Sequence, residues 1–230
     1  MLYGMQTDSF LQEHELLLDF PSHIADMLKT GAVDVGLIPV AILNQLPNYH
    51  IVSDFCIASD FDVASVCLFS EVPVKDLTTI YLDYQSRSSV ALLKILMKEF
   101  WGINPILIEA ENESFRTKIN GTTGALIIGD RALEQRRLST YIYDLAGEWK
   151  ALTGLPFVFA VWVSLKPMSE EWINKFNAAN AIGLTKLDEI AEQQKYPVYD
   201  LRKYYSHHIS YLLTDEKRKG IERFLEFMNV

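Results

Sequence analysis

The sequence has few cysteines, no long apolar run and no excess of basic residues, and each of these absences excludes a class of protein. Only Cys56 and Cys67 occur among 230 residues, which is too few for a disulfide scaffold. We expect two reduced core thiols in a cytoplasmic protein. No apolar run approaches the roughly 18 residues of a membrane span, and residues 1–5 lack the basic and apolar regions of a signal peptide.

Acidic residues predominate, with 30 Asp and Glu against 21 Lys and Arg and a net charge of −9. The excess lies in the first 164 residues, which carry 20 acidic and 11 basic side chains, whereas the rest has ten of each. Phosphate binding needs a basic footprint, so a nucleic-acid partner is not expected. An anionic small molecule would have to be bound by local dipoles and a few well-placed donors.

The common catalytic and cofactor motifs are also missing. The sequence has no G-x-S-x-G, no Walker A, no G-x-G-x-x-G and no H-E-x-x-H. The histidines have no metal-ligand spacing with a carboxylate or thiol, so no metal site is predicted; they are His14, His23, His50, His207 and His208.

Short apolar runs alternate with helical patterns, which predicts an α/β fold with parallel sheets covered on both faces. Strands are predicted over residues 16–20, 33–38, 63–69, 78–82, 105–108, 124–128, 141–143 and 157–163. Helices are predicted over residues 21–30, 86–100, 170–194, 200–213 and 215–228.

The two longest apolar runs, 63–69 and 157–163, suggest hinge strands that join two lobes. One lobe would comprise residues 1–69 with 158–230, including the helical C-terminal tail, and the other residues 70–157. A cleft between such lobes is a natural ligand site.

The most informative segment ends a predicted strand and begins the clearest helix, with Ser86, Arg87, Ser88 and Ser89 at the start. One serine suffices to cap a helix. Further hydroxyls, free N–H groups and the helix dipole would suit a carboxylate. Arg87 either clamps that carboxylate or pairs with Asp83 as scaffold.

Three further positions are candidates for the same site. Gly129 ends a buried strand and would let a ligand approach the backbone, and Asp130 either caps the next helix or acts as an acid or base. Ser65 is a polar residue within the first hinge run. Phe157 is expected to pack in the core or to line the cleft.

The segments DVGLIPVAIL, LDYQSRSSVALL, ALIIGDRAL and YDLAGEWKALTGLPFVFAVW occur in this order. Together with FCIASD and VASVCLFS they resemble chorismate dehydratase of the futalosine route to menaquinone. The resemblance implies the type-2 periplasmic-binding-protein fold, with two lobes on two hinge strands and a helical tail.

The resemblance implies a cytoplasmic lyase that converts chorismate, a dianion, to 3-[(1-carboxyvinyl)oxy]benzoate without a cofactor. Ser86 would be catalytic, and Ser65, Arg87, Ser88, Ser89, Gly129, Asp130 and Phe157 would bind the substrate. No side chain is an obvious base, so the substrate's own side-chain carboxylate would take the proton. The alternatives are a non-catalytic carboxylate-binding protein of this fold and the sister 1,4-dihydroxy-6-naphthoate synthase.

The sequence departs from the family pattern in three places. Ser88 stands where the family has threonine, and 60–62 (Asp-Phe-Asp) lacks a glycine usual before the first hinge strand. The family's first strand and its asparagine turn are not among the 230 residues, from which we expect weak catalysis.

Overall fold

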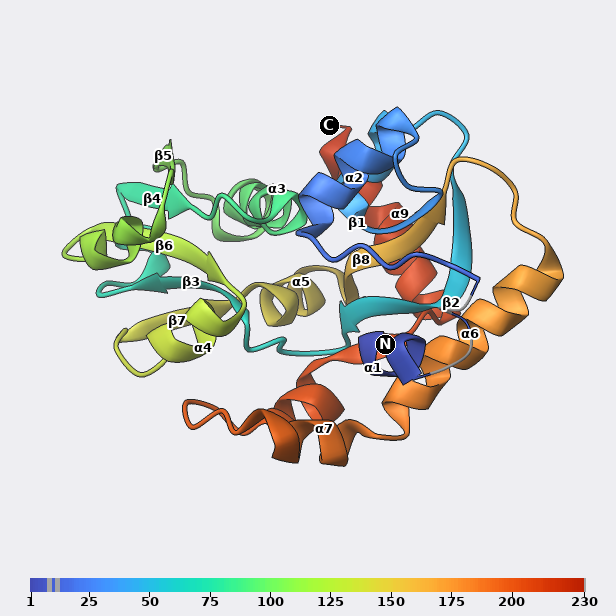
Figure 1. Cartoon of the computed structure of the whole chain (residues 1–230). Coiled ribbons are helices and arrows are strands. Elements are labelled where there is room, and N and C mark those ends of the chain that lie inside the picture. Colours follow the sequence, from blue (N-terminus) through green and yellow to red (C-terminus); the bar gives the residue numbers. More distant parts are fainter. Residues whose placement is uncertain (8–9, 11–12, 230) are drawn as a thin grey trace.

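The computed structural model describes residues 1–7, 10 and 13–229, which build two separate β-sheets with helices around and between them (Figure 1). The first sheet has the strand order β1-β8-β2-β9 and the second the order β5-β4-β6-β3-β7. The first consists of β1 (Val35–Pro39), β2 (His50–Ser59), β8 (Phe157–Ser164) and β9 (Ser210–Leu212). The second consists of β3 (Val66–Ser70), β4 (Thr79–Leu82), β5 (Ile106–Glu109), β6 (Thr123–Ile128) and β7 (Tyr141–Asp144).

The helices pack against these sheets and between them (Figure 1). The α-helices are α1 (Leu2–Thr7), α2 (Pro21–Thr30), α3 (Arg87–Leu96), α4 (Asp130–Gln135), α5 (Leu145–Thr153), α6 (Glu170–Leu184), α7 (Leu187–Gln194), α8 (Leu201–Lys203) and α9 (Asp215–Met228). Short 3₁₀ helices span Val40–Gln45, Val74–Asp76 and Glu113–Lys118, and π-helical turns span Met97–Trp101 and Tyr204–His208. No helix among the described residues combines the length and the apolar character needed to cross a bilayer.

The α/β class is confirmed, but the prediction of parallel sheets is wrong in strand direction. Every strand pair of the first sheet is antiparallel. In the second sheet β4 runs parallel to β5 and β6, whereas β3 runs antiparallel to β6 and β7. A strand buried on both faces is apolar throughout in either direction, so its composition does not report the direction of its neighbour.

Two element predictions are corrected. Residues 16–20 form no strand, and Leu17, Leu18 and Phe20 are exposed there. Within 200–213, expected to be helical, the chain instead forms the edge strand β9 on β2. In both cases pairing with a distant strand, or its absence, overrides the local pattern.

The chain passes between the two sheets through residues 60–65 and returns through α5 and residues 154–156. The two runs expected to be hinge strands therefore lie each within one sheet, since β3 belongs to the second and β8 to the first. We call residues 1–59 and 157–230 the first lobe and residues 66–144 the second lobe. The division predicted from sequence, after residues 69 and 157, stays a proposal close to these limits.

One buried carboxylate holds the crossover segment 60–65. The carboxylate of Asp144 accepts hydrogen bonds from Val63 N (3.0 Å) and Ala64 N (2.7 Å), and it also caps α5 by accepting from Ala146 N (3.2 Å). Ala64 has a φ of 63°, a left-handed conformation that is uncommon for alanine. Burial raises the pKa of Asp144 despite these donors.

Helix α9 packs directly on the return path of the chain. An aromatic cluster fixes it there, with Phe224 edge-on to Phe157 (5.1 Å between ring centroids) and near Trp149 (6.2 Å). At Gly220 the helix backbone comes so close that a Cβ would lie 2.4 Å from the carbonyl oxygen of Pro156. Only glycine permits this approach.

Gly220→Ala should therefore destabilise the protein, although alanine is the better helix former by about 1 kcal/mol. Overpacking against a backbone atom typically costs about 1–3 kcal/mol, and we expect a net loss of roughly 1–2 kcal/mol in the free energy of unfolding, measured with urea. The control is Arg218→Ala, an exposed position of the same helix, which should change it by less than about 0.5 kcal/mol. A stabilised Gly220→Ala variant would contradict the close approach.

Candidate functional site

The candidate residues gather at the edge of the second sheet that faces the first lobe. Strands β4 and β6 are parallel neighbours, so the residues after them, Asp83 to Ser86 and Gly129, leave the sheet on the same side. Strand β3 runs antiparallel to β6, with Val66 opposite Ile128, so Ser65 enters the sheet at that edge. The predicted juxtaposition of Ser65 and Gly129 is direct, because Gly129 N donates a hydrogen bond to Ser65 O (2.8 Å).

Ser86 is the N-cap of α3. Its hydroxyl oxygen accepts from Ser89 N (3.1 Å) and its proton goes to Ser89 Oγ (2.8 Å). The hydroxyl thus does the capping that one serine can supply, with Ser89 buried behind it. The remaining N–H groups of the first turn and the dipole of a ten-residue helix are directed toward the same edge.

Ser88 connects the start of α3 to the first lobe. Its buried hydroxyl donates to Phe159 O (3.0 Å) on β8 and accepts from Ala41 N (3.3 Å) in the 3₁₀ helix Val40–Gln45. Both of its hydrogen-bonding directions are therefore used by the protein. The structure places Ser88 and Ser89 in support of the helix start.

Arg87 forms an ion pair that joins the lobes. Its two terminal nitrogens contact the two carboxylate oxygens of Asp26 on α2, at 3.3 and 2.9 Å. This pair is half-exposed, and the guanidinium lowers the pKa of Asp26 through these hydrogen bonds. The expected scaffold pair of Arg87 with Asp83 is wrong, because Arg87 turns toward the first lobe whereas Asp83 is buried in the second.

The partner of Asp83 is Arg131 in the first turn of α4. The buried carboxylate contacts Arg131 Nη2 (2.9 Å) and accepts from Ile128 N (3.1 Å) and Gln85 N (2.9 Å). Arg131 also donates to Glu113 (3.0 Å). This network fixes the turns after β4 and β6 relative to each other. Local reading overlooked the pair, although the positions of both residues at the ends of neighbouring predicted strands could have revealed it.

Gly129 has the conformation and the open surroundings that a ligand-contacting glycine needs. Its φ and ψ of 66° and −149° lie in a region that only glycine adopts readily. A Cβ built there would meet nothing within 4 Å. The prediction that Asp130 caps α4 is wrong, because the N-cap is Gly129 with no side-chain hydrogen bond; Asp130 is exposed in the first turn.

Ser65 lies in the crossover segment, one residue before β3, rather than in the middle of a strand. It is buried, and its hydroxyl lies 2.8 Å from the hydroxyl of Tyr204 in the C-terminal part of the chain. Tyr196 reaches the same neighbourhood, since its hydroxyl donates to Asp130 O (3.2 Å). Tyr204 carried no signal in the sequence beyond its place in an apparently helical segment.

Phe157 lies in the core. It is 1% exposed and packs edge-on to Phe159 (4.7 Å between ring centroids) and to Trp149 (5.6 Å). Of the two roles expected from the sequence, the structure places it in core packing.

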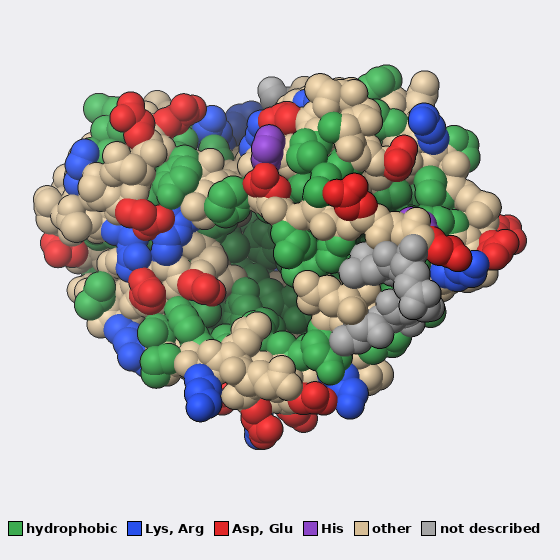
Figure 2. Space-filling model, in the orientation of Figure 1, with side chains coloured by type: hydrophobic (Ala, Val, Ile, Leu, Met, Phe, Trp, Pro, Cys, Tyr) green, Lys and Arg blue, Asp and Glu red, His purple; other side chains and the backbone are tan. Residues whose placement is uncertain are grey.

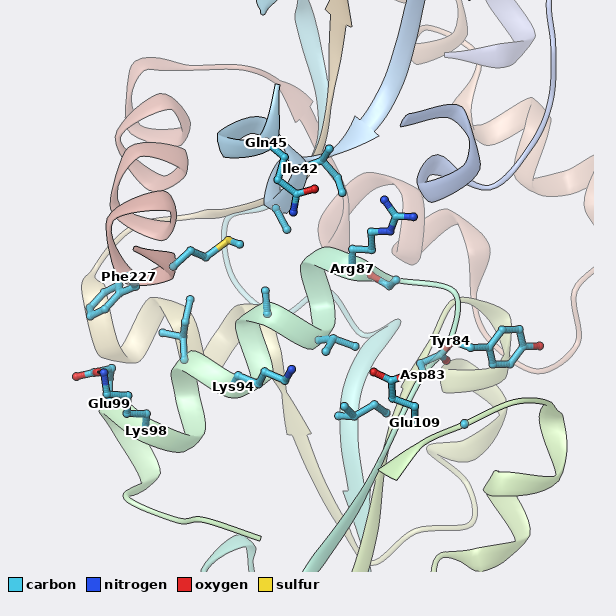
Figure 3. Close-up of a pocket in the computed structure, with 18 residues that line it drawn as sticks. Ile42, Gln45, Asp83, Tyr84, Arg87, Lys94, Lys98, Glu99, Glu109 and Phe227 are labelled. Atoms are coloured by element: carbon cyan, nitrogen blue, oxygen red, sulfur yellow. The ribbon is translucent and has the colours of Figure 1, made fainter. Parts of the chain in front are cut away.

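Open space adjoins this edge on both sides of α3. Figure 2 shows a hollow lined by hydrophobic side chains between the second lobe on the left and the first on the right. A cavity of about 770 Å³ runs along α3, with Arg87 and Asp83 toward one end and Lys98, Glu99 and Phe227 at the other (Figure 3). Of the predicted residues, Ser86 and Arg87 line it. Across the described residues, no three His, Cys, Asp or Glu side chains converge as metal ligands.

The two-lobed fold is that of periplasmic-binding-protein-like proteins. A crystal structure of a protein from Archaeoglobus fulgidus is similar with a TM-score of 0.73 and 11% identity, covering 99% of this chain and 92% of the other. The periplasmic aliphatic sulphonate binding protein SsuA from Escherichia coli is similar with a TM-score of 0.55 and 13% identity, covering 100% and 84%.

The chain belongs to the family described as menaquinone biosynthesis, whose sequence model matches residues 1–229. The chorismate dehydratase of Thermus thermophilus is 28% identical over 96% of this chain and 89% of that protein. The chorismate dehydratase of Campylobacter jejuni is 31% identical over 47% of this chain and 51% of that protein. The family resemblance predicted from the motifs is confirmed.

The buried Asp83–Arg131 pair should be essential to stability. Asp83→Asn leaves the guanidinium without its anion in a nearly enclosed place, and breaking a buried pair in this way typically costs roughly 3–5 kcal/mol. The matched control is Glu134→Gln, which breaks the more exposed pair with Arg116 (3.0 Å) and should cost less than about 1 kcal/mol. Urea unfolding measures both, and equal small losses would contradict the role assigned to Asp83.

Proposed function

We propose that this protein is a chorismate dehydratase that supplies menaquinone biosynthesis by the futalosine pathway. The observation that carries the proposal is the match to the Thermus thermophilus chorismate dehydratase over nearly the whole chain. The candidate site adds chemical support, because a helix N-terminus, an arginine and an open glycine lie where an anionic ligand would meet both lobes.

The reaction removes water from chorismate to give 3-[(1-carboxyvinyl)oxy]benzoate. A ring proton and the ring hydroxyl leave, and together they make the water. Since the ring becomes aromatic, the product is strongly favoured, and the enzyme needs to orient the dianion and to stabilise charge as the proton departs. We infer that the side-chain carboxylate of the substrate accepts this proton. No cofactor is required by this chemistry.

We assign roles according to the geometry. The first turn of α3 with Ser86 binds a substrate carboxylate, and Ser86 donates to the charge that develops. Arg87 joins it by exchanging Asp26 for the substrate. Gly129, Asp130 and Ser65 form the facing wall, whereas Ser88, Ser89 and Phe157 act from behind it by fixing α3 and the core. Two free, buried cysteines agree with a cytoplasmic location.

A second candidate function is the capture of a small carboxylate without turnover. The observation in its favour is the structural likeness to SsuA, a binding protein. Incubation with chorismate, followed by chromatography of the product and by a calorimetric titration, separates the two. Product formation supports the dehydratase, whereas binding without product supports the capture protein. A chain that neither binds nor converts chorismate would contradict both.

Ser86→Ala tests the site directly. If Ser86 donates to developing charge, turnover should fall by about 10²-fold or more. Capping is lost as well, at a typical cost of about 1 kcal/mol in stability. The matched control is Ser169→Ala, which removes the N-cap of α6, where the serine accepts from Trp172 N at 3.2 Å. It should lose similar stability and keep its turnover, so unchanged turnover in Ser86→Ala would reduce Ser86 to a cap.

A further inference from the structure

The C-terminal part of the chain is attached to the crossover segment 60–65 at points only a few residues apart. Nδ1 of His208 lies 2.9 Å from Asp62 O, and the hydroxyl of Tyr204 lies 2.8 Å from Ser65 Oγ. These contacts join residues 139 and 146 positions apart. The π-helical turn Tyr204–His208 is therefore a built part of the wall that surrounds Ser65.

A buried lysine anchors the next turn of the chain to the same segment. Lys217 on α9 is 2% exposed, and its ammonium donates to Ser210 Oγ (2.6 Å) and lies 3.3 Å from a carboxylate oxygen of Asp60. Strand β9 adds backbone pairing to β2 of the first lobe. Tyr204 is thus presented to Ser65 from a segment fixed on the first lobe.

The same segment also reaches the second lobe. The guanidinium of Arg137 donates to the carbonyl oxygens of Pro197 (3.2 Å) and Val198, beside the contact of Tyr196 with Asp130 O. The position of Tyr204 is therefore defined by contacts with both lobes.

The phenol of Tyr204 can act on Ser65 as a donor at any physiological pH. Burial raises the pKa of Tyr204 to about 12, so the proton stays on the phenol. A serine hydroxyl has one proton and two acceptor positions. When the more acidic phenol donates into one acceptor position, the single proton of Ser65 is left for another partner.

We propose that Tyr204 is a positioning residue of the active site, which donates to Ser65 Oγ and thereby directs the Ser65 proton to the substrate. The proposal rests on the proposed function, in which Ser65 belongs to the wall that binds chorismate. Nothing in the chain's motifs assigns Tyr204 a role.

Tyr204→Phe keeps the ring and removes the hydroxyl, so it isolates this contact. Ser65 binds the substrate equally before and during the reaction in this scheme, so the loss should appear in KM and not in kcat. We expect KM for chorismate to rise about five- to tenfold, in the range of one weakened hydrogen bond to a charged group, with kcat unchanged within about twofold. A merely structural role would lower the active fraction and hence kcat.

The adjacent tyrosine provides the matched control. Tyr205 lies on the same turn, but its hydroxyl donates to Gln194 Oε1 (2.7 Å), away from Ser65. Tyr205→Phe should leave KM and kcat within about twofold of the wild type.

A double-mutant cycle with Ser65→Ala decides whether Tyr204 acts through Ser65. In the Ser65→Ala background, Tyr204→Phe should have no further effect on KM. Independent, additive effects overturn the proposal, as does a Tyr204→Phe variant with wild-type KM. Because the wild-type assay comes first, a chain without chorismate turnover overturns the proposed function and this inference together. An active chain insensitive to Tyr204→Phe overturns the inference alone.

Discussion

The carboxylate of Asp144 is the group on which the arrangement of the two sheets depends. It binds the amides of Val63 and Ala64 on the outward pass of the chain and caps α5 on the return pass. One side chain therefore ties the two connections together and holds Ala64 in its left-handed conformation. An acid can occupy such a place because backbone N–H groups satisfy it, whereas an unpaired buried carboxylate would be very costly. Ser65 and Gly129 follow directly from this fixed point.

Those parts of the fold that depend on neighbouring residues could be predicted from the sequence. Helix α2 begins at Pro21 and ends before Gly31, whose φ of 74° closes it, and α3 begins at the capping Ser86. What could not be predicted depends on distant pairing. Strand β8 lies between β1 and β2, and register shifts interrupt the β2–β8 ladder, so β2 shows neither clean alternation nor a continuous apolar run.

The same distinction holds within the site. The sequence indicated that serines and an arginine meet at a helix start, because capping chemistry is local. It did not indicate where their other hydrogen bonds go. Arg87 finds Asp26 at a distance of 61 positions, and Ser88 finds Phe159 at 71. No periodicity or turn signal reports such contacts, so a motif of three similar hydroxyls contains one cavity-lining residue and two that are enclosed.

This division explains how the site can accept an anion while its frame stays in place. The bonds of Ser88 to the first lobe are buried, and leaving such groups unpaired costs about 1–3 kcal/mol each. The Arg87–Asp26 pair is half-exposed, and pairs of this kind contribute at most about 1 kcal/mol. A substrate carboxylate can therefore take Arg87 from Asp26 at little cost, whereas separating α3 from the first lobe would break the stronger contacts. Exchange of a salt-bridge partner, with α3 held by Ser88, is thus the least costly way for this cleft to bind its ligand.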